Sequence, residues 1–435
     1  MNKYIGIGVA NLCLSLCLGF SMTAQAAKFK VDNLGDSEDA NPGNGICDAS
    51  GGGCTLRAAI DEANASSDAD DIRVPAGLIT ANASLKITQE VKISGNGAGK
   101  TIIQGDGSHR VFAVEFAGKV LIKKVTIQGG VASGDDGGGV LNVGSRLTID
   151  NSEIVNNYAG DQGGGIHNRE GGDLTVLKSD ISDNEAETRG GGIYVRGDGS
   201  VLTVKHSRIS GNESGDDGGG ISNSGPLAII SHSDIVDNKS AQEGGGLINR
   251  DGGKALISHC TIIGNFAMSG GGLFNNVDSV MTVDFSDIED NDATGDGGGL
   301  LNQAGEATID HCKISGNEAG DQGGGLHNRS TSSDTGEMTV VQSDIGWNTA
   351  ATGGGGIYNR EDSVLMVEKS KVRGNTAFRG AGIFTSTGSE LTVEGKSKIE
   401  SNVAGNDGGG IFDEGAIIDV TDTKFKNNVP NDINL

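Results

Sequence analysis

Residues 174–193 read Leu-Thr-Val-Leu-Lys-Ser-Asp-Ile-Ser-Asp-Asn-Glu-Ala-Glu-Thr-Arg-Gly-Gly-Gly-Ile, and this phrase returns along most of the chain. The first glycines of its copies lie at 137, 163, 190, 218, 244, 270, 297, 323, 354, 380 (Gly-Ala-Gly) and 408, so that successive copies are 26 to 31 residues apart. A fixed period of this length predicts a solenoid, in which each repeat buries its apolar face only by stacking on the next.

Within a copy, apolar residues occur at every second position and are interrupted by Gly, Asn or Asp, which is the pattern of short strands and turns. The residue after the glycines is always aliphatic, and this inward column is Val140, Ile166, Ile193, Ile221, Leu247, Leu273, Leu300, Leu326, Ile357, Ile383 and Ile411. We therefore predict a right-handed parallel β-helix with one coil per 26–28 residues and equivalent side chains about 4.8 Å apart.

Asparagine recurs in two columns, and each column predicts a ladder of side-chain amides that hydrogen-bond from coil to coil. One comprises Asn157, Asn184, Asn212, Asn238, Asn265, Asn291, Asn317, Asn348, Asn375 and Asn402; the other comprises Asn142, Asn168, Asn223, Asn249, Asn275, Asn302, Asn328 and Asn359. The glycines predict a corner with positive φ and a close approach between coils. Composition agrees, with 75 glycines and only 4% aromatic residues among 435.

The chain divides into four parts. Residues 1–26 have the apolar run and the Ala-Gln-Ala site of a signal peptide; residues 27–84 are an N-terminal capping region, 85–428 the β-helix and 429–435 a tail. In the capping region, residues 55–64 have one apolar face and predict a short amphipathic helix over the open end of the solenoid. We expect a disulfide between Cys47 and Cys54, and free, buried thiols at Cys260 and Cys312.

Two resemblances follow from these residues. Gly-Ile-Cys-Asp at 45–48, with Cys-Thr-Leu-Arg-Ala-Ala-Ile at 54–60, resembles the CSLREA domain of exported bacterial β-helix proteins, with Thr55 and Ala58 in place of serine and glutamate. The coils, such as Ile-Ser-Gly-Asn at 209–212 followed by Gly-Gly-Gly-Ile at 218–221, are similar to polymorphic outer membrane protein repeats. Together the resemblances imply a secreted or outer-surface bacterial protein with a passenger-like, often adhesive, rod.

Charge limits the partners. The formal net charge is −25, which disfavours nucleic acid and anionic membrane surfaces. No run after residue 26 approaches the roughly 18 apolar residues of a membrane span.

Acidic residues precede the glycines in many coils. Stacked carboxylates repel one another, and calcium would relieve the repulsion through oxygen ligands, so calcium is a possible ion here although none is required. The alternative is a solvated acidic edge, because Arg189, Ser269 and Arg379 interrupt the column. The candidate ligands are Asp135, Asp136, Asp161, Asp216 and Asp217.

A further column follows the inward aliphatic residue and, by strand alternation, is expected to face outward. Its rings, with arginines two residues later, suit sugar stacking and hydrogen bonding; alternatively, they pack on the sheet while the arginines pair with Glu170, Asp251 and Glu361. The candidate ligand-binding residues are His167, Tyr194, Phe274, His327, Tyr358, Arg169, Arg196, Arg250, Arg329 and Arg360.

These patterns favour binding over catalysis. Glycan cleavage needs a carboxylate, base or cation cluster at a defined spacing, and we find no unique cluster that breaks the repeat. We therefore hypothesise an adhesin-like or matrix-interacting binding protein with a polysaccharide or surface glycan as ligand. The alternative is a polysaccharide lyase that acts on an acidic glycan. One coil is longer than its neighbours, which predicts a protruding loop within residues 330–336.

Overall fold

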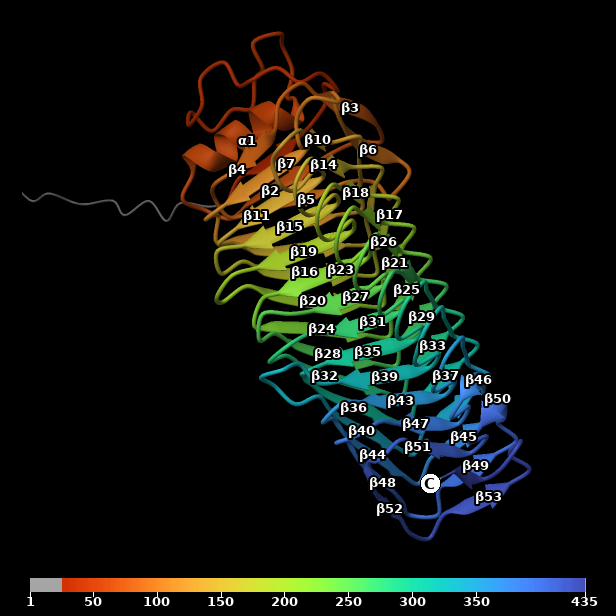
Figure 1. Ribbon diagram of the computed structural model, residues 1–435. Coiled ribbons are helices and arrows are strands. Elements are labelled where there is room, and N and C mark those ends of the chain that lie inside the picture. The colour runs from red at the N-terminus through yellow and green to blue at the C-terminus, as the bar shows by residue number, and fades with distance from the viewer. Residues whose placement is uncertain (1–25, 435) are drawn as a thin grey trace, which may run out of the picture.

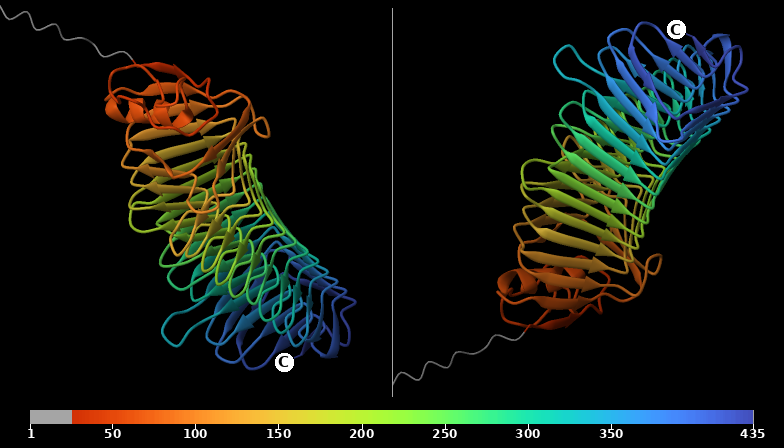
Figure 2. Two further views of the ribbon diagram at one scale, coloured as in Figure 1. Left: turned by 90° about the horizontal axis from the view of Figure 1, so that it is seen from above. Right: turned by 90° about the horizontal axis from the view of Figure 1, so that it is seen from below.

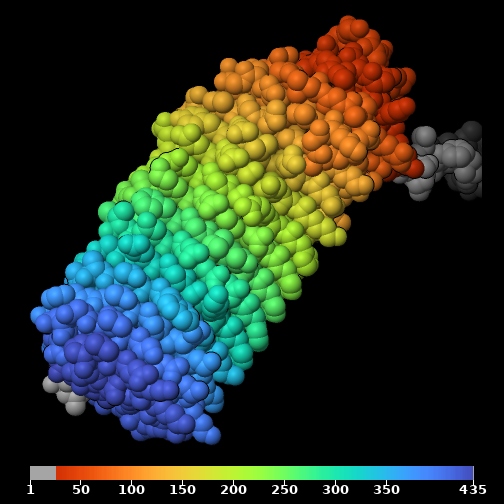
Figure 3. Space-filling model, turned by 90° about the vertical axis from the view of Figure 1, so that its right-hand side faces the viewer, coloured from red at the N-terminus to blue at the C-terminus, as the bar shows by residue number. Residues whose placement is uncertain are grey.

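The computed structural model describes residues 26–434 and shows one continuous rod (Figures 1 and 3). Four parallel sheets run along it, and each full coil contributes one strand to each sheet in chain order. Because the strands of successive coils pair in parallel, the predicted β-helix is confirmed. The signal peptide prediction falls on residues 1–26, which lie almost wholly outside the described part of the chain.

Sheet 1 is the longest and starts before the expected boundary at residue 85. Its inward residues, such as Leu174 and Val176, are fully buried. Its strands are β1 (Lys28–Lys30), β2 (Asp70–Arg73), β5 (Val91–Ser94), β8 (Lys119–Lys123), β12 (Arg146–Asp150), β16 (Asp173–Leu177), β20 (Val201–Lys205), β24 (Leu227–Ser231), β28 (Lys254–Ser258), β32 (Val280–Asp284), β36 (Glu306–Asp310), β40 (Glu337–Val341), β44 (Val364–Glu368), β48 (Glu390–Glu394) and β52 (Ile417–Val420).

Sheet 2 follows sheet 1 after a corner whose residue has positive φ, such as Lys178 at 47°. Its strands are β3 (Gly77–Ala81), β6 (Thr101–Gly105), β9 (Thr126–Gln128), β13 (Glu153–Val155), β17 (Asp180–Ser182), β21 (Arg208–Ser210), β25 (Asp234–Val236), β29 (Thr261–Ile263), β33 (Asp287–Glu289), β37 (Lys313–Ser315), β41 (Asp344–Gly346), β45 (Lys371–Arg373), β49 (Lys398–Glu400) and β53 (Lys424–Lys426).

Sheet 3 is made mostly of two-residue strands, and sequence periodicity did not predict it. In each strand the second residue is small and buried, as Ala159 and Ala186 are. Its strands are β10 (Val131–Ala132), β14 (Tyr158–Ala159), β18 (Glu185–Ala186), β22 (Glu213–Ser214), β26 (Lys239–Ser240), β30 (Phe266–Ala267), β34 (Asp292–Ala293), β38 (Glu318–Ala319), β42 (Thr349–Ala350), β46 (Thr376–Arg379) and β50 (Val403–Asp407).

Sheet 4 begins directly after the glycines and holds the inward aliphatic column, whose members are all fully buried. Its strands are β4 (Leu85–Ile87), β7 (Phe112–Glu115), β11 (Val140–Val143), β15 (Ile166–Arg169), β19 (Ile193–Arg196), β23 (Ile221–Ser224), β27 (Leu247–Asn249), β31 (Leu273–Asn275), β35 (Leu300–Gln303), β39 (Leu326–Arg329), β43 (Ile357–Arg360), β47 (Ile383–Thr385), β51 (Ile411–Asp413) and β54 (Ile433–Asn434).

The glycines form the corner that leads into sheet 4. The first glycine of each copy has positive φ, for example 66° at Gly218. The middle glycine lies close to the next coil, because a Cβ on Gly219 would lie 2.4 Å from the backbone oxygen of Lys239; only in the copy at 380–382 does a residue with a side chain, Ala381, occupy this position. Both predicted roles of the glycines are therefore confirmed.

Both asparagine ladders are confirmed. In the first, the amide of Asn238 donates to Asn265 at 3.0 Å, and the same bond repeats along the column as far as Asn428. In the second, Asn249 donates to Asn275 at 3.0 Å. Each amide also donates to backbone carbonyls, so the corners stay satisfied although they are buried.

The N-terminal end is covered by helix α1 (Leu56–Ala65), as predicted (Figure 1). Thr55 caps the helix by accepting from the amide of Ala58, and Asn64 donates to the carbonyl of Lys86 at 2.8 Å. The Cys47–Cys54 disulfide holds the preceding loop. Glu62 is buried although it is charged, and its carboxylate accepts the backbone N–H groups of two glycines, Gly43 and Gly45.

Two further expectations are met along the rod. Cys260 and Cys312 are free and buried, and burial raises the pKa of each thiol, to about 11 and about 12. Residues 330–336 form a loop without strand structure that leaves the side of the rod between β39 and β40 (Figure 2).

Candidate functional site

The column of rings on the outer side of sheet 4 is buried. His167 and Phe274 have no exposed surface, and Tyr194 and Tyr358 are only 2% and 7% exposed. The expectation that this column faces solvent is therefore wrong, although strand alternation does turn it away from the main core. The segment that runs from sheet 3 to the glycines covers it and creates a second, outer core.

The residue just before the first glycine closes this outer core, and we call this position the pre-glycine column. Its members pair in register from coil to coil, as Gln162, Arg189, Asp217, Glu243 and Ser269 do. Their side chains lie against the rings. Arg379, for example, lies 5.6 Å from the ring centre of Phe412 in the next coil.

Three arginines of the predicted binding set pair with acidic members of the pre-glycine column. Arg169 contacts Asp136 at 3.1 Å and Arg329 contacts Asp296 at 3.1 Å, while Arg250 pairs with Asp217. Weaker contacts join arginines to Glu170, Asp251 and Glu361, at 3.7, 3.5 and 3.3 Å. The guanidinium groups therefore compensate a large part of the buried acidic column.

The electrostatics of these pairs depend on burial. Burial favours the protonated form of Asp136, but the hydrogen bond and charge of His167, together with Arg169, outweigh it and lower the pKa of Asp136. At Asp296 burial prevails over Arg329, and the pKa is raised. The same pattern of residues therefore shifts the pKa of the aspartate in opposite directions in different coils.

The five candidate calcium ligands are engaged by the protein. Asp135 pairs with Arg110, Asp161 accepts from Thr188 and Asp216 accepts from Gln242; Asp136 and Asp217 pair with the arginines described above. Within residues 26–434 no group of three or more His, Cys, Asp or Glu side chains is arranged to hold a metal ion. These carboxylates do not form a calcium cage in this conformation.

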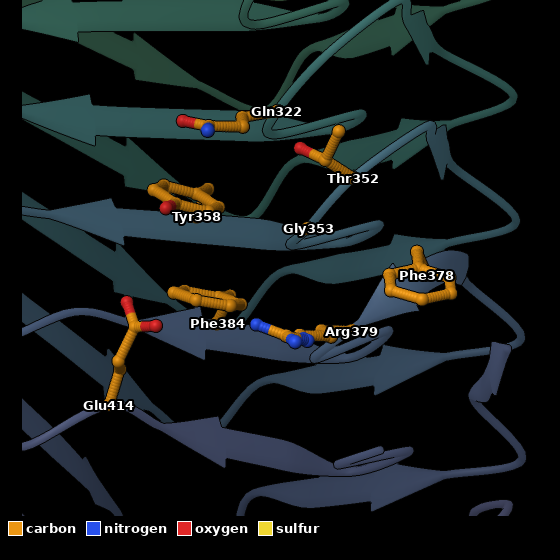
Figure 4. Close-up of a pocket in the computed structure, with 8 residues that line it drawn as sticks. All are labelled: Gln322, Thr352, Gly353, Tyr358, Phe378, Arg379, Phe384 and Glu414. Atoms are coloured by element: carbon orange, nitrogen blue, oxygen red, sulfur yellow. The ribbon is translucent and has the colours of Figure 1, made fainter. Parts of the chain in front are cut away.

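The outer core opens near its C-terminal end, where Gly353 occupies the pre-glycine position. A Cβ at Gly353 would lie 2.9 Å from a ring carbon of Tyr358 and 3.0 Å from one of Phe384. Beside Gly353 and these two rings lies a pocket of about 380 Å³, which we call the notch pocket (Figure 4). It is lined by Gln322, Thr352, Gly353, Tyr358, Phe378, Arg379, Phe384 and Glu414.

The walls of the notch pocket combine rings with polar groups. Tyr358 and Phe384 stack with centroids 4.5 Å apart and lie side by side in Figure 4, while Phe378 across the pocket is 52% exposed. Burial raises the pKa of Tyr358 to about 12, so its hydroxyl stays protonated at neutral pH. The volume is within the range of pockets for small molecules.

Two polar atoms of the pocket lack hydrogen-bond partners among the described residues. Arg379 Nε is a buried donor and Gln322 Oε1 is a buried acceptor, and both are left unsatisfied. Both atoms are shielded from solvent, so the charged groups that face a ligand in the pocket are the guanidinium group of Arg379 and the carboxylate of Glu414. Hydroxyl groups can both accept from the first and donate to the second.

Of the predicted binding residues, only Tyr358 lines the notch pocket. Arg360 belongs to the same strand, β43, and contacts Glu361 instead; Arg196 is exposed elsewhere on the rod. Phe378, Arg379 and Glu414 were not predicted as ligand residues. Two sequence signals could have indicated the pocket: the run of four glycines at 353–356 and the small residue two positions after each ladder asparagine, which identifies sheet 3.

Comparison with known proteins agrees with the architecture. A model of the right-handed β-helix region matches residues 76–262. Together with the four parallel sheets, this match defines a right-handed parallel β-helix protein. No curated protein matches the chain.

Three solved structures align with most of this chain at low sequence identity. The A-module of mannuronan C-5 epimerase AlgE4 from Azotobacter vinelandii aligns over 87% of this chain and 92% of its own, with 16% identity and a TM-score of 0.44. The A-module of mannuronan C-5 epimerase AlgE6 from the same organism aligns over 85% of this chain and 94% of its own, with 15% identity and a TM-score of 0.36. Pectate lyase Pel9A aligns over 92% of this chain and 79% of its own, with 10% identity and a TM-score of 0.29.

No helix within residues 26–434 is long and apolar enough to cross a membrane.

Proposed function

We propose that this protein is an exported bacterial β-helix that binds carbohydrate through the notch pocket, as an adhesin-like or matrix-interacting protein. The signal-like residues 1–26 and the resemblance of residues 45–64 to the CSLREA domain support export. The Cys47–Cys54 disulfide agrees with an oxidising compartment. The rod itself displays the pocket away from its capped N-terminal end.

The observation that carries the proposal is the chemistry of the pocket walls. The exposed ring of Phe378 offers an apolar surface to the C–H face of a sugar, and the guanidinium group of Arg379, which lines the pocket, offers N–H donors to its hydroxyls. Glu414, which also lines the pocket, adds an acceptor. A sugar ring meets these apolar, donor and acceptor groups at once, whereas a purely apolar ligand leaves the polar groups without a partner.

A glycan array with the mature chain tests this proposal directly. We expect a restricted set of glycans to bind, and the Phe378→Ala variant to lose about tenfold or more in affinity, which corresponds to about 1.4 kcal/mol. Phe116→Ala is the matched control, because Phe116 is 67% exposed on a distant coil. The proposal fails if no glycan binds, or if both variants bind equally well.

Binding and cleavage are separated by a second readout. Incubation with uronate-containing polysaccharides, followed by ultraviolet absorbance, detects the unsaturated product of a lyase. We expect no such product. A product whose formation is abolished by Arg379→Gln would replace the binding function with lyase activity at the same pocket.

A further inference from the structure

A different corner of the rod, between sheets 1 and 2, contains a column with no acidic residue from Lys124 to Lys396. Its residues all have the same left-handed backbone, with φ between 46° and 71°. We call it the corner column. Its members are Lys124, Asn151, Lys178, His206, His232, His259, Phe285, His311, Gln342, Lys369 and Lys396. On a chain with a net charge of −25, such a stripe is an exception.

Rings form the middle of the corner column, where they stack on one another. His232 and His259 lie 4.8 Å apart with an interplanar angle of 2°, and Phe285 and His311 lie 4.6 Å apart. All of these side chains are exposed. Since each inner ring has its faces covered by its neighbours, the ladder presents ring edges and their N–H groups to solvent.

Lysines gather at the C-terminal end of the corner column. Lys371, Lys398 and Lys424 lie directly opposite one another on β45, β49 and β53. Lys369, Lys371, Lys396 and Lys398 line a surface pocket of about 480 Å³, together with Ser370, Gly395 and the carboxylate of Asp422. We call it the lysine pocket.

These lysines differ from the other stacked charges of the molecule because they lack partners. The buried carboxylates Asp136, Asp217 and Asp296 each have an arginine. In the described part of the chain, Lys371, Lys396, Lys398 and Lys424 form no ion pair. Lys369 contacts Glu368. The carboxylate of Asp344 pairs with Arg373 instead of with a lysine. Like charges directly opposite on neighbouring strands are destabilising. An anionic ligand removes that repulsion.

We propose that the corner column is a binding track for an anionic polysaccharide, with the lysine pocket as its anchoring end. The charged and N–H groups recur at the coil rise of about 4.8 Å along a line parallel to the rod axis. A thin, extended chain with one acidic group per sugar follows such a line. The track lies on another corner than the notch pocket and does not depend on its function.

Two observations favour a polysaccharide over a nucleic acid. Single-stranded nucleic acid is bound by bases that stack on exposed ring faces, but here the rings cover one another. The stripe is also one residue wide and is flanked by carboxylates such as Asp284 and Asp310, which repel a wide polyanion with charges on all sides.

The test is polymer binding by the mature chain at low ionic strength, measured by biolayer interferometry. The probes are polygalacturonate, dextran sulfate, uncharged dextran and a single-stranded oligonucleotide. We expect one or both anionic polysaccharides to bind, the uncharged dextran not to bind at the track, and the carboxylate and sulfate arms to identify the preferred group. Preferential binding of the oligonucleotide would overturn the polysaccharide assignment.

Variants locate the binding. The triple variant Lys371→Gln, Lys396→Gln, Lys398→Gln should weaken binding by about tenfold or more. The control Lys86→Gln, Lys239→Gln, Lys254→Gln removes the same charge from other faces and should change it by less than about twofold. Equal losses would show a non-specific charge effect and overturn the track. Circular dichroism verifies that both variants remain folded.

Two further measurements test the track and its independence. His232→Ser with His259→Ser should weaken binding of a long polymer but not of a short oligomer, which reaches only the lysine pocket. If the double variant weakened binding of the long polymer and of the short oligomer equally, the ligand would not extend along the corner column, and the proposal would be contradicted. Phe116→Ala should leave anionic polymer binding unchanged, and uncharged glycans report on the notch pocket alone, so that failure of the notch pocket and failure of the track are distinguishable.

Discussion

The outer core of the rod has a closed part and an open part, and one residue position separates them. From His167 to His327 the rings are sealed by pre-glycine side chains such as Arg189 and Gln322. At the next coil Gly353 takes that position, and the rings of Tyr358 and Phe384 line a pocket. Both parts have the same backbone, the same glycine corner and the same register.

The difference teaches where a repeat protein can place a site. Regular coils pack their side chains against equivalent side chains of the neighbouring coils, so these side chains stabilise the fold and are not free to contact a ligand. A departure at one position leaves partners on both sides without their expected contact. At Gly353 those partners are an aromatic pair and the guanidinium group of Arg379, and they line the pocket at which we propose that glycan binds.

The largest expected effect on stability comes from truncating a buried ring in the closed part of the outer core. Phe274 is fully buried between Ile248 and Leu301. Phe274→Ala should reduce the free energy of unfolding by about 3–5 kcal/mol, because it removes a large buried ring and leaves a cavity. Urea unfolding followed by circular dichroism measures it. Phe378→Ala, at the exposed rim, should change it by less than about 0.5 kcal/mol. Similar losses for the two variants would contradict a sealed outer core.

A pH effect of intermediate size comes from His327, at the boundary of the two parts. Burial, with help from Arg329 and Arg360, lowers the pKa of His327 well below 6.5. The unfolded chain therefore binds a proton near pH 6.5 while the folded chain does not, and stability falls as the pH drops below that value.

Replacement of this histidine tests the effect. His327→Phe should abolish a loss of up to about 1.4 kcal/mol per pH unit below pH 6.5. Phenylalanine already occupies the equivalent position in three coils, at Phe274, Phe384 and Phe412. Unfolding free energies at pH 7.0 and pH 5.5 measure the change. An unaltered pH dependence in the variant would show that His327 is protonated in the folded protein.

The smallest expected effect on stability, but a decisive one for binding, comes from closing the notch. Unlike Gly354, with φ of 63°, Gly353 does not have a left-handed backbone, so it can carry a side chain once the two rings shift slightly. Gly353→Gln restores the residue of the preceding coil and should lower stability by about 1 kcal/mol through overpacking, because its Cβ would lie 2.9 and 3.0 Å from two buried rings. Glycan affinity should fall at least about tenfold.

The reverse change sharpens the same comparison. Gln322→Gly should open a second notch beside His327 and expose ring surface there. Binding of an environment-sensitive dye such as anilinonaphthalene sulfonate measures that exposure. If Gly353→Gln still binds glycan as tightly as the unmodified chain, the ligand does not occupy the notch pocket.

Much of the fold was predictable because it depends on period and alternation. The spacing of the glycines predicted the coils, the asparagines predicted both ladders, and Thr55 to Asn64 predicted the capping helix. Sheet 3 was missed, because strands of two residues have no detectable alternation. The rings were therefore expected at the surface, whereas they are buried under the segment that runs from sheet 3 to the glycines.

The candidate site was predictable only in part. Tyr358 was identified from its column, but Gln322, Arg379 and Glu414 come from other coils and meet it only through stacking in register. The histidines and lysines of the corner column also recur at the coil period, yet their accumulation on one line becomes visible only when the shared backbone conformation is known.

The sequence by itself determined the solenoid, its corners and its ladders, because each of these depends on contacts between copies of one residue type at a fixed interval. Only the tertiary structure decided which outward side chains are covered and which charges lack partners. Exposure and pairing depend on how the segment before each glycine packs over the neighbouring coils. The residues of that segment vary from coil to coil, so their packing, and not a repeated pattern, specifies the arrangement.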